Sequence, residues 1–342
     1  MSVIANGYTD MSQQCLGLMS RFQYLGRRIS FGAGLVLPIL LMAICWTPVA
    51  EAATYGIGVC PNVYRQCLLE WKAERIAYLK SDQGYLNLAG LFWLREGIST
   101  FGSGAGNDLL FPAAAMPEMG TFELGESGVV MNVRGGVDVR MDGNPVSSVQ
   151  MADDTSDQPS VVTFGSFAWT VIRRDDRFAV RLRDFDRPAL STFSPIDYYP
   201  TDENLRVDAR LQRYDQPRIV KVDTVIEGLD YNPTSPGLLR FNIGGQSFEL
   251  EAYNAGDEFL LVFGDATSGR ETYPAGRFLY ANKPGKDGVV VLDFNTAQNP
   301  PCAFNEFATC PIASPRNRLA IRIPAGERYR STGSDSIDSP NH

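Results

Sequence analysis

The stretch of this sequence from Glu271 to Leu319 is dense in polar side chains between short runs of β-forming residues, and Asp265 lies just before it. Carboxylates there could act as general acids or bases, and an arginine could anchor an anion. Loops that carry such groups are common places for binding and catalytic sites. The candidate catalytic carboxylates are Asp265, Glu271 and Asp293. The candidate ligand-binding side chains are Tyr273, Arg277, Asn295, Asn299 and Asn317.

The same residues also have a structural interpretation. Asp265 begins a turn, where an aspartate can bond its own backbone. If the expected strands 276–281 and 288–294 pair as a hairpin, Arg277 and Asp293 lie near its open end and could form a clamp. The sequence leaves both interpretations of the cluster open.

Other features of the sequence limit its chemistry. The single histidine, His342, is the last residue, which excludes Ser-His-Asp catalysis, Cys-His catalysis and zinc sites with histidine ligands. No GxxxxGK[ST] loop is present, and no Rossmann glycine pattern lies between a strand and a helix. We therefore predict no metal and no cofactor. Because the net charge is −8, the chain is a poor binder of phosphate backbones, and we predict no nucleic-acid partner.

Residues 1–52 have the features of an export signal. Arginines precede an apolar run over residues 31–49, and a small-x-small cleavage site ends at Ala52. Met19 is an alternative start, and an uncleaved membrane anchor is an alternative outcome because the run is near spanning length. We predict cleavage after Ala52 and a periplasmic or extracellular protein, attached to a membrane only if the leader is retained.

The number of cysteines after the leader is consistent with an exported protein. Of six cysteines, Cys15 and Cys45 fall in the leader, which leaves four. An even number in an exported protein indicates disulfides, and local pairing is the simplest of three connectivities. Free buried thiols are the alternative. The expected pairs are Cys60–Cys67 and Cys302–Cys310.

The pattern of apolar residues predicts a mainly β fold. A helix is expected over 62–81, where Leu69, Ala73 and Ile76 recur at helical spacing. Alternation then predicts strands at 137–141, 168–174, 177–183, 205–211, 238–243, 247–253, 258–264, 276–281, 288–294 and 319–323. Closely spaced strands with few helices favour an antiparallel sandwich or barrel-like sheet with one N-terminal helix.

We expect three regions along the chain. The leader, residues 1–52, is followed by a single β-rich domain over 53–330, with a subdomain break near 200–204 as an alternative. The polar tail, 331–342, is expected to be disordered.

Seven arginines recur along three of the expected β segments. They could share a surface and bind an anion. The favoured interpretation is a solvated face paired with neighbouring aspartates. These arginines are Arg173, Arg174, Arg177, Arg181, Arg183, Arg206 and Arg210.

The C-terminal motifs resemble those of a family of bacterial and archaeal proteins, domain of unknown function 1684. The similar residues are Asp265, Thr267, Gly269, Thr272-Tyr273, Gly276-Arg277, Asp293-Phe294-Asn295, Ala297, Asn299-Pro300, Cys302-Ala303, Cys310-Pro311, Asn317 and Ala325-Gly326-Glu327. Upstream, Gly84-Tyr85-Leu86 and Gly90-Leu91-Phe92-Trp93-Leu94 are also similar. The resemblance runs from about Cys67 to Glu327.

Some positions depart from the family pattern. Tyr85 replaces the usual tryptophan, Gln298 replaces a tyrosine, and Ala313-Ser314 replaces a proline-rich stretch. The resemblance implies a shared domain that is often exported or lipid-anchored, and it implies no activity or site roles.

Three functional classes fit these observations. The first is an exported β-rich protein that binds a small molecule, glycan or partner through the C-terminal polar motif. The second is a histidine-free hydrolase or lyase with carboxylates as its acid and base, as in glycosidases. The third is thiol redox chemistry at Cys302 and Cys310, which ranks last because the Cys-x-x-Cys spacing is absent. We favour the first class.

Overall fold

The computed structural model describes residues 61–330. The predicted export signal, Cys60 and the tail with His342 lie outside the described residues. The chain divides into two compact units between Arg75 and Ile76. No helix within 61–330 is both long and apolar enough to cross a membrane.

The predicted N-terminal helix is confirmed as α2 (Pro61–Lys80). Its buried side differs from the expected one. Leu69 is 61% exposed, whereas the preceding residue, Leu68, is only 2% exposed. The buried residues recur three or four positions apart, as a helix requires. They include Tyr64, Cys67, Leu68, Trp71, Arg75 and Leu79.

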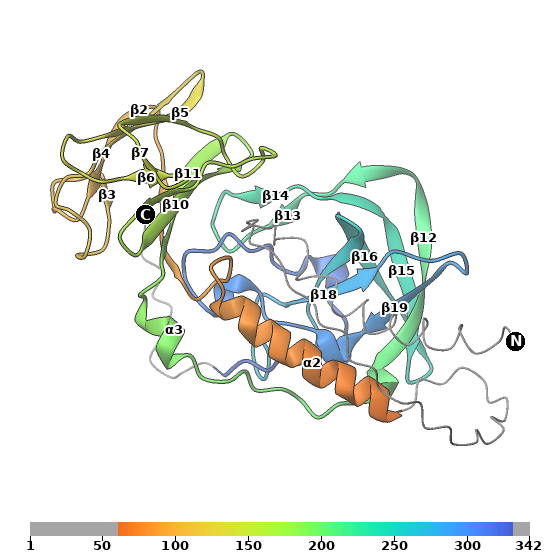
Figure 1. Ribbon diagram of the computed structural model, residues 1–342. Helices are drawn as coiled ribbons and strands as arrows, with labels where there is room; N and C mark the ends of the chain where they lie inside the picture. The colour runs from red at the N-terminus through yellow and green to blue at the C-terminus, as the bar shows by residue number, and fades with distance from the viewer. Residues whose placement is uncertain (1–60, 331–342) are drawn as a thin grey trace, which may run out of the picture. The chain divides into compact units, whose positions relative to one another are not determined.

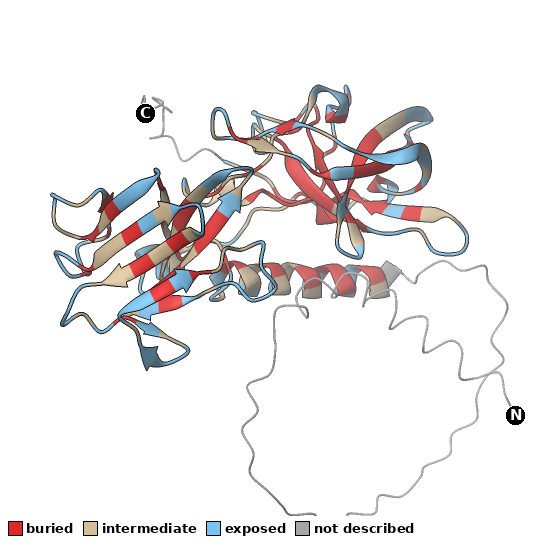
Figure 2. Cartoon of the chain, turned by 90° about the horizontal axis from the view of Figure 1, so that it is seen from above, coloured by how far each residue is buried: buried red, intermediate tan, exposed pale blue. Residues whose placement is uncertain are grey.

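Two sheets enclose the first β core. The strands of one are, in spatial order, β1 (Leu88–Trp93), β11 (Arg177–Asp184), β10 (Phe167–Arg174), β9 (Val162–Phe164), β6 (Arg140–Met141) and β7 (Asn144–Pro145). Those of the other are β3 (Leu109–Leu110), β2 (Gly97–Gly102), β4 (Gly120–Gly125), β5 (Gly128–Val133) and β8 (Ser148–Met151). Apolar residues of both sheets pack in one cluster around Trp169 and Phe101. Buried and exposed residues alternate along these strands (Figure 2).

The third large sheet is barrel-like and carries the polar motif. Its strand order is β18 (Arg277–Asn282), β17 (Glu258–Phe263), β16 (Gln246–Ala255), β15 (Thr234–Ile243), β12 (Arg206–Ile219) and β19 (Val289–Asp293). All neighbours pair antiparallel, and the end strands β18 and β19 contact each other, so the sheet nearly closes. Figure 1 shows β12, β15 and β16 as long curved strands. The predicted mainly β, barrel-like fold is confirmed.

Short elements complete the chain. Two small strands pair with each other, β13 (Val222–Asp223) and β14 (Asp230–Tyr231). The remaining helical turns are α3 (Pro188–Thr192), η2 (Glu203–Leu205), η3 (Phe294–Thr296), η4 (Pro301–Ala303) and η5 (Pro315–Asn317).

Three strand predictions are corrected. Of the expected strand 137–141, only β6 forms, because backbone bonds such as Val137 N to Arg134 O make a turn there. Segment 319–323 is not a strand, because its backbone bonds to the 264–266 loop and to a side chain rather than to a ladder. Strands β18 and β19 do not form a hairpin: β18 pairs with β17, and β19 pairs with β12.

The cysteines in the described region are bonded. Cys302 and Cys310 form a disulfide with a Cα–Cα distance of 6.2 Å, in agreement with the expected pair. Cys67 is also disulfide-bonded. The predicted Cys60–Cys67 pair includes a residue outside the described region.

Candidate functional site

A buried ion pair lies at the centre of the polar motif. Arg277 Nη2 is 3.3 Å from Asp265 Oδ1, and both side chains are 0% exposed. The arginine also donates from Nη2 to Ile323 O at 2.9 Å and from Nη1 to Ala325 O. Its guanidinium lies 5.1 Å from the ring centroid of Phe263. Burial lowers the pKa of Arg277, and the charge of Asp265 opposes that change.

Asp265 accepts several further hydrogen bonds. Ile323 N donates to Oδ2 at 2.7 Å, and Thr267 Oγ1 donates to Oδ1 at 2.8 Å. Ser268 Oγ donates to the same carboxylate at 3.4 Å. This side chain therefore joins the loop after β17 to segment 323–325. A carboxylate satisfied in this way is held in place and has little freedom to act as an acid or base.

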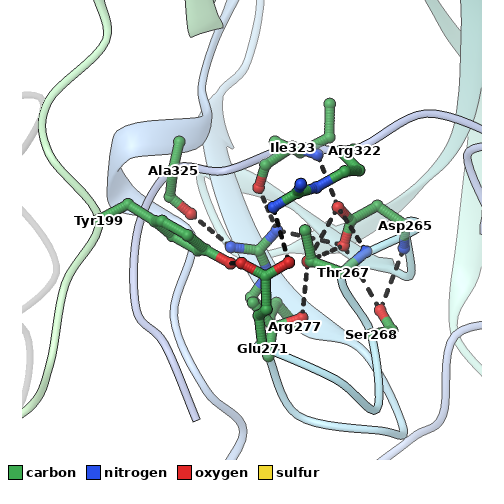
Figure 3. A network of polar contacts seen from close by, with 10 residues as sticks. Tyr199, Asp265, Thr267, Ser268, Glu271, Arg277, Arg322, Ile323 and Ala325 are labelled. Atoms are coloured by element: carbon green, nitrogen blue, oxygen red, sulfur yellow. Dashed lines mark hydrogen bonds and ion pairs between the residues drawn. The ribbon is translucent and has the colours of Figure 1, made fainter.

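Glu271 lies at the exposed side of this network. Its Oε2 accepts from the Tyr199 hydroxyl at 3.0 Å, and its Oε1 accepts from Arg322 Nη2 at 2.6 Å. Figure 3 shows the three side chains converging beside Arg277. Burial, followed by the hydrogen bond to Glu271, raises the pKa of Tyr199. The tyrosine is therefore a hydrogen-bond donor at neutral pH rather than a base.

Asp293 and Asn295 form a separate clip. Asp293 Oδ1 accepts from Asn295 N and from Asn295 Nδ2, both at 3.1 Å, and so caps η3. Asn295 also accepts from Asp202 N at 2.9 Å and donates to Asp202 O at 2.8 Å. Asp293 Oδ2 lies 3.9 Å from Arg206 Nε. The expected Arg277–Asp293 clamp is replaced by two clamps, because β18 and β19 do not pair.

The remaining candidates each join separate segments. Asn299 N donates to Glu327 Oε2 at 2.7 Å, and Asn299 Nδ2 donates to Arg328 O at 3.0 Å. The Tyr273 hydroxyl donates to Cys302 O at 3.3 Å, and burial raises the pKa of this tyrosine.

Asn317 joins two neighbouring strands. It accepts from Glu251 N at 2.8 Å and donates to Glu251 O at 3.0 Å and to Val262 O at 3.1 Å. Its side chain therefore holds β16 to β17 from within the core, where it is 0% exposed.

The structure thus brings together only some of the predicted site residues. Asp265, Glu271 and Arg277 share one hydrogen-bond network. Asp293 and Asn295 form a second network, and Asn317 belongs to a third. Within residues 61–330, no group of three or more His, Cys, Asp or Glu side chains could hold a metal ion. The predicted residues therefore form hydrogen bonds and ion pairs that join segments of the protein to one another.

Sequence reasoning missed a hollow on the same sheet. A groove of about 730 Å³ crosses β12, β15, β16 and β19. Charged, polar and aromatic side chains line it. They are Asp208, Arg210, Arg240, Phe241, Asn242, Ser247, Phe248, Glu249 and Val289. Alternation of charged with apolar residues in 206–211 was the available signal, but the pairing of strands that assembles the groove is not local.

Fold and site together define a class of mainly β proteins in which a buried polar motif stabilises a nearly closed antiparallel barrel. Residues 191–328 match the family described as a protein of unknown function, DUF1684. The match covers this part of the chain, and it confirms the resemblance seen in the C-terminal motifs.

A solution NMR structure of an uncharacterised protein from Haloarcula marismortui is 27% identical, with a TM-score of 0.35. The similarity covers 40% of this chain and 78% of that one. No curated protein matches the chain.

Proposed function

We propose that this protein is an exported binding protein for a small molecule or glycan, and that the ligand occupies the groove across β12, β15, β16 and β19. The observation that carries the proposal is the groove itself. Its volume of about 730 Å³ falls in the range of small-molecule sites, roughly 300–1,000 Å³. Its polar lining side chains are exposed, unlike the buried side chains of the motif.

The groove offers both donors and acceptors to a ligand. Arg240 Nε lies 3.4 Å from Glu249 Oε2, an arrangement that holds both groups at the surface. Ser247 Oγ donates to Asn242 Oδ1 at 2.7 Å, which leaves the asparagine amide hydrogens directed to solvent or ligand. Asp208 forms no ion pair with any residue of 61–330.

The groove is lined by equal numbers of acidic and basic side chains. Asp208 and Glu249 offset Arg210 and Arg240, so a strongly charged ligand of either sign meets repulsion as well as attraction. An uncharged ligand with many hydroxyl groups can donate to carboxylates and accept from guanidinium groups at once. The half-buried ring of Phe248 adds an apolar surface. A glycan fits this combination best.

The C-terminal motif supports this groove from the side. Arg316 Nη1 lies 3.4 Å from the groove residue Glu249, and the next residue, Asn317, is bonded to the backbone of Glu251. Through these contacts the motif positions β16. Its part in binding is to hold the ligand-contacting strand rather than to touch the ligand.

The alternative function, a carboxylate-based hydrolase or lyase that uses Asp265, Glu271 or Asp293, has less support. Such chemistry needs two accessible carboxylates. The side chain of Asp265 is 0% exposed and that of Asp293 is 11% exposed, and both are bonded to the protein. Glu271 is more exposed at 31%, but it is ion-paired with Arg322.

Calorimetric titration of the protein with soluble mono- and oligosaccharides tests the binding proposal. We expect saturable binding that weakens about tenfold or more in Asp208→Ala and Arg240→Ala, because each removes a hydrogen bond at a charged group. Asp257→Ala, in the turn between β16 and β17, and Arg213→Ala, on β12, change exposed charges outside the groove and serve as matched controls. Equal losses in all four variants, or no binding by any sugar, would contradict it.

Export is tested separately. Residues 1–60 fused to a reporter enzyme that is active only outside the cytoplasm are expected to give activity. The N-terminal sequence of the secreted fusion is expected to begin at Ala53. An inactive fusion would contradict export, and a retained leader would contradict cleavage. Neither result would bear on the proposed binding groove.

A further inference from the structure

One face of the first sheet carries arginines away from the apolar core. On β11, Val180 and Leu182 lie in the core, so the alternating residues Arg181 and Arg183 point to the opposite face. Arg181 lies opposite Thr170 of β10 on one side and Leu91 of β1 on the other. It is therefore on the central strand of a three-strand surface rather than at an edge.

The two neighbouring arginines have protein partners. Arg174 Nη1 donates to both oxygens of Asp154, at 2.8 and 3.1 Å. Arg183 Nη1 donates to Gly84 O and to Asn87 Oδ1. Both guanidinium groups are thereby fixed on this face.

Arg181 is different. Its Nε is shielded from solvent and has no hydrogen-bond partner among the residues that the structure describes. No carboxylate of residues 61–330 forms an ion pair with it, and the nearby Asp154 is already engaged by Arg174. Burial, then the charge of Arg174 and in smaller part that of Arg183, lowers the pKa of Arg181 to about 10, against raising effects of Asp154 and Tyr85.

A partly buried cation without a counter-ion is costly, whereas a bound anion would remove the cost. The fork of a guanidinium matches the oxygens of phosphate, sulfate or carboxylate groups. The Arg181 residue as a whole is only half-buried, so a small ligand can reach its open side.

We propose that Arg181, flanked by Arg174 and Arg183, binds a small oxoanion, free or as the anionic group of a ligand. Arg181 supplies an unsatisfied donor at Nε, and the guanidinium groups of Arg174 and Arg183 lie near enough to act on its charge. Asp154 offsets the charge of Arg174 and Asp82 acts on Arg183, so the excess positive charge is centred on Arg181, which suits the negative charge of an oxoanion. The site lies on a different sheet from the groove and does not depend on the function proposed for it.

Titration calorimetry with inorganic phosphate and with sulfate, at ionic strength matched with sodium chloride, tests the proposal. Binding by the unaltered protein is expected to weaken about tenfold or more in Arg181→Gln. Arg181→Lys is expected to fall between, since it keeps the charge and loses the fork. Arg177→Gln is the control: this arginine is on the same strand but stacks on Trp93 at 4.1 Å, and its loss should leave phosphate binding unchanged.

A second measurement needs no variant. The nitrogen-detected NMR signal of the Arg181 Nε–H group is expected to shift when phosphate is added. It is expected to stay unchanged when sodium chloride is added to the same ionic strength. Glycerol 3-phosphate identifies the source of the anion: tighter binding than phosphate indicates a phosphorylated metabolite, and weaker binding indicates the free ion. Absence of both the calorimetric signal and the NMR shift would overturn the proposal, as would equal binding by Arg181→Gln.

Discussion

Arg277 and Asp265 form an ion pair that is fully removed from solvent, with 3.3 Å between Nη2 and Oδ1. The pair bridges β18 and the loop after β17, and the arginine reaches on to the carbonyls of Ile323 and Ala325. One side chain therefore fixes three segments, two of them neighbours in the sequence and the third 46 to 48 residues further on. This arrangement explains why the motif is dense in polar residues although it is buried.

Removing one member of this pair is expected to be severe. Arg277→Met leaves Asp265 buried and unpaired, and should lower the free energy of unfolding by about 3–5 kcal/mol. Adding Asp265→Asn removes the unpaired charge and should restore part of the loss. Urea unfolding followed by tryptophan fluorescence measures both. Arg213→Met, at an exposed position on β12, is the control, and a loss for Arg277→Met no larger than for that control would contradict the clamp.

The amide of Asn317 is expected to matter through its hydrogen bonds rather than its volume. Asn317→Leu keeps the size but leaves buried backbone groups of Glu251 and Val262 unsatisfied. The unfolding free energy should fall by at least about 2 kcal/mol, and amide exchange at Glu251 should accelerate. Asn254→Leu, at an exposed position on β16, provides the comparison. Unchanged exchange at Glu251 would argue against the role of Asn317.

The disulfide between Cys302 and Cys310 closes a short loop, with a sequence separation of 8. The double variant Cys302→Ser, Cys310→Ser should lose about 2–3 kcal/mol of stability by the loop-entropy relation. Thermal unfolding of the two proteins under identical oxidising conditions gives the difference. A midpoint equal to that of the unaltered protein would show that the loop is held by its other contacts, such as Asn305 Nδ2 to Tyr85 O at 2.9 Å.

Stability is expected to fall in alkaline solution, in part through Tyr253. Burial raises its pKa to about 12 in the folded protein, against 10.0 as the ordinary value. Its contribution is complete below pH 10, since neither state is ionised there, and is lost as pH rises through 10 toward 12, since the unfolded chain ionises first. Tyr253→Phe should reduce the slope of unfolding free energy against pH in this window. The same slope in both proteins would contradict this assignment.

Local patterns predicted β10, β11 and the six strands of the barrel-like sheet, but none of the strands in the sheet β3-β2-β4-β5-β8. The hairpin of β10 and β11 turns at Asp175, which has a φ of 53°, and its apolar residues alternate as expected. The second half of β12 has exposed residues at nearly every position and therefore no periodic signal. Segment 319–323 has apolar alternation without a ladder, because Asp265 and the 264–266 loop take up its backbone groups.

The site was harder to predict because its contacts are distant in sequence. The partners of Arg277 include Asp265, which lies nearby, but also carbonyls 46 and 48 residues away. The groove is lined by strands β12, β15, β16 and β19, and their neighbourhood in the sheet cannot be read from any one segment of the sequence. Residue types left open whether the motif forms a site or a set of structural clamps, whereas the register of six strands decided which side chains would remain accessible.

The segment around Gln298 has a consequence for association between chains. Gln298 N and O both bond to Phe278 of the end strand β18, at 2.9 and 2.8 Å. These bonds use the backbone, so the glutamine in place of the family's tyrosine preserves them. Pro300 and Pro301 follow and have no N–H to offer. These bonds occupy the backbone groups of Phe278, and so reduce the length of open edge that β18 offers for edge-to-edge aggregation with a second molecule.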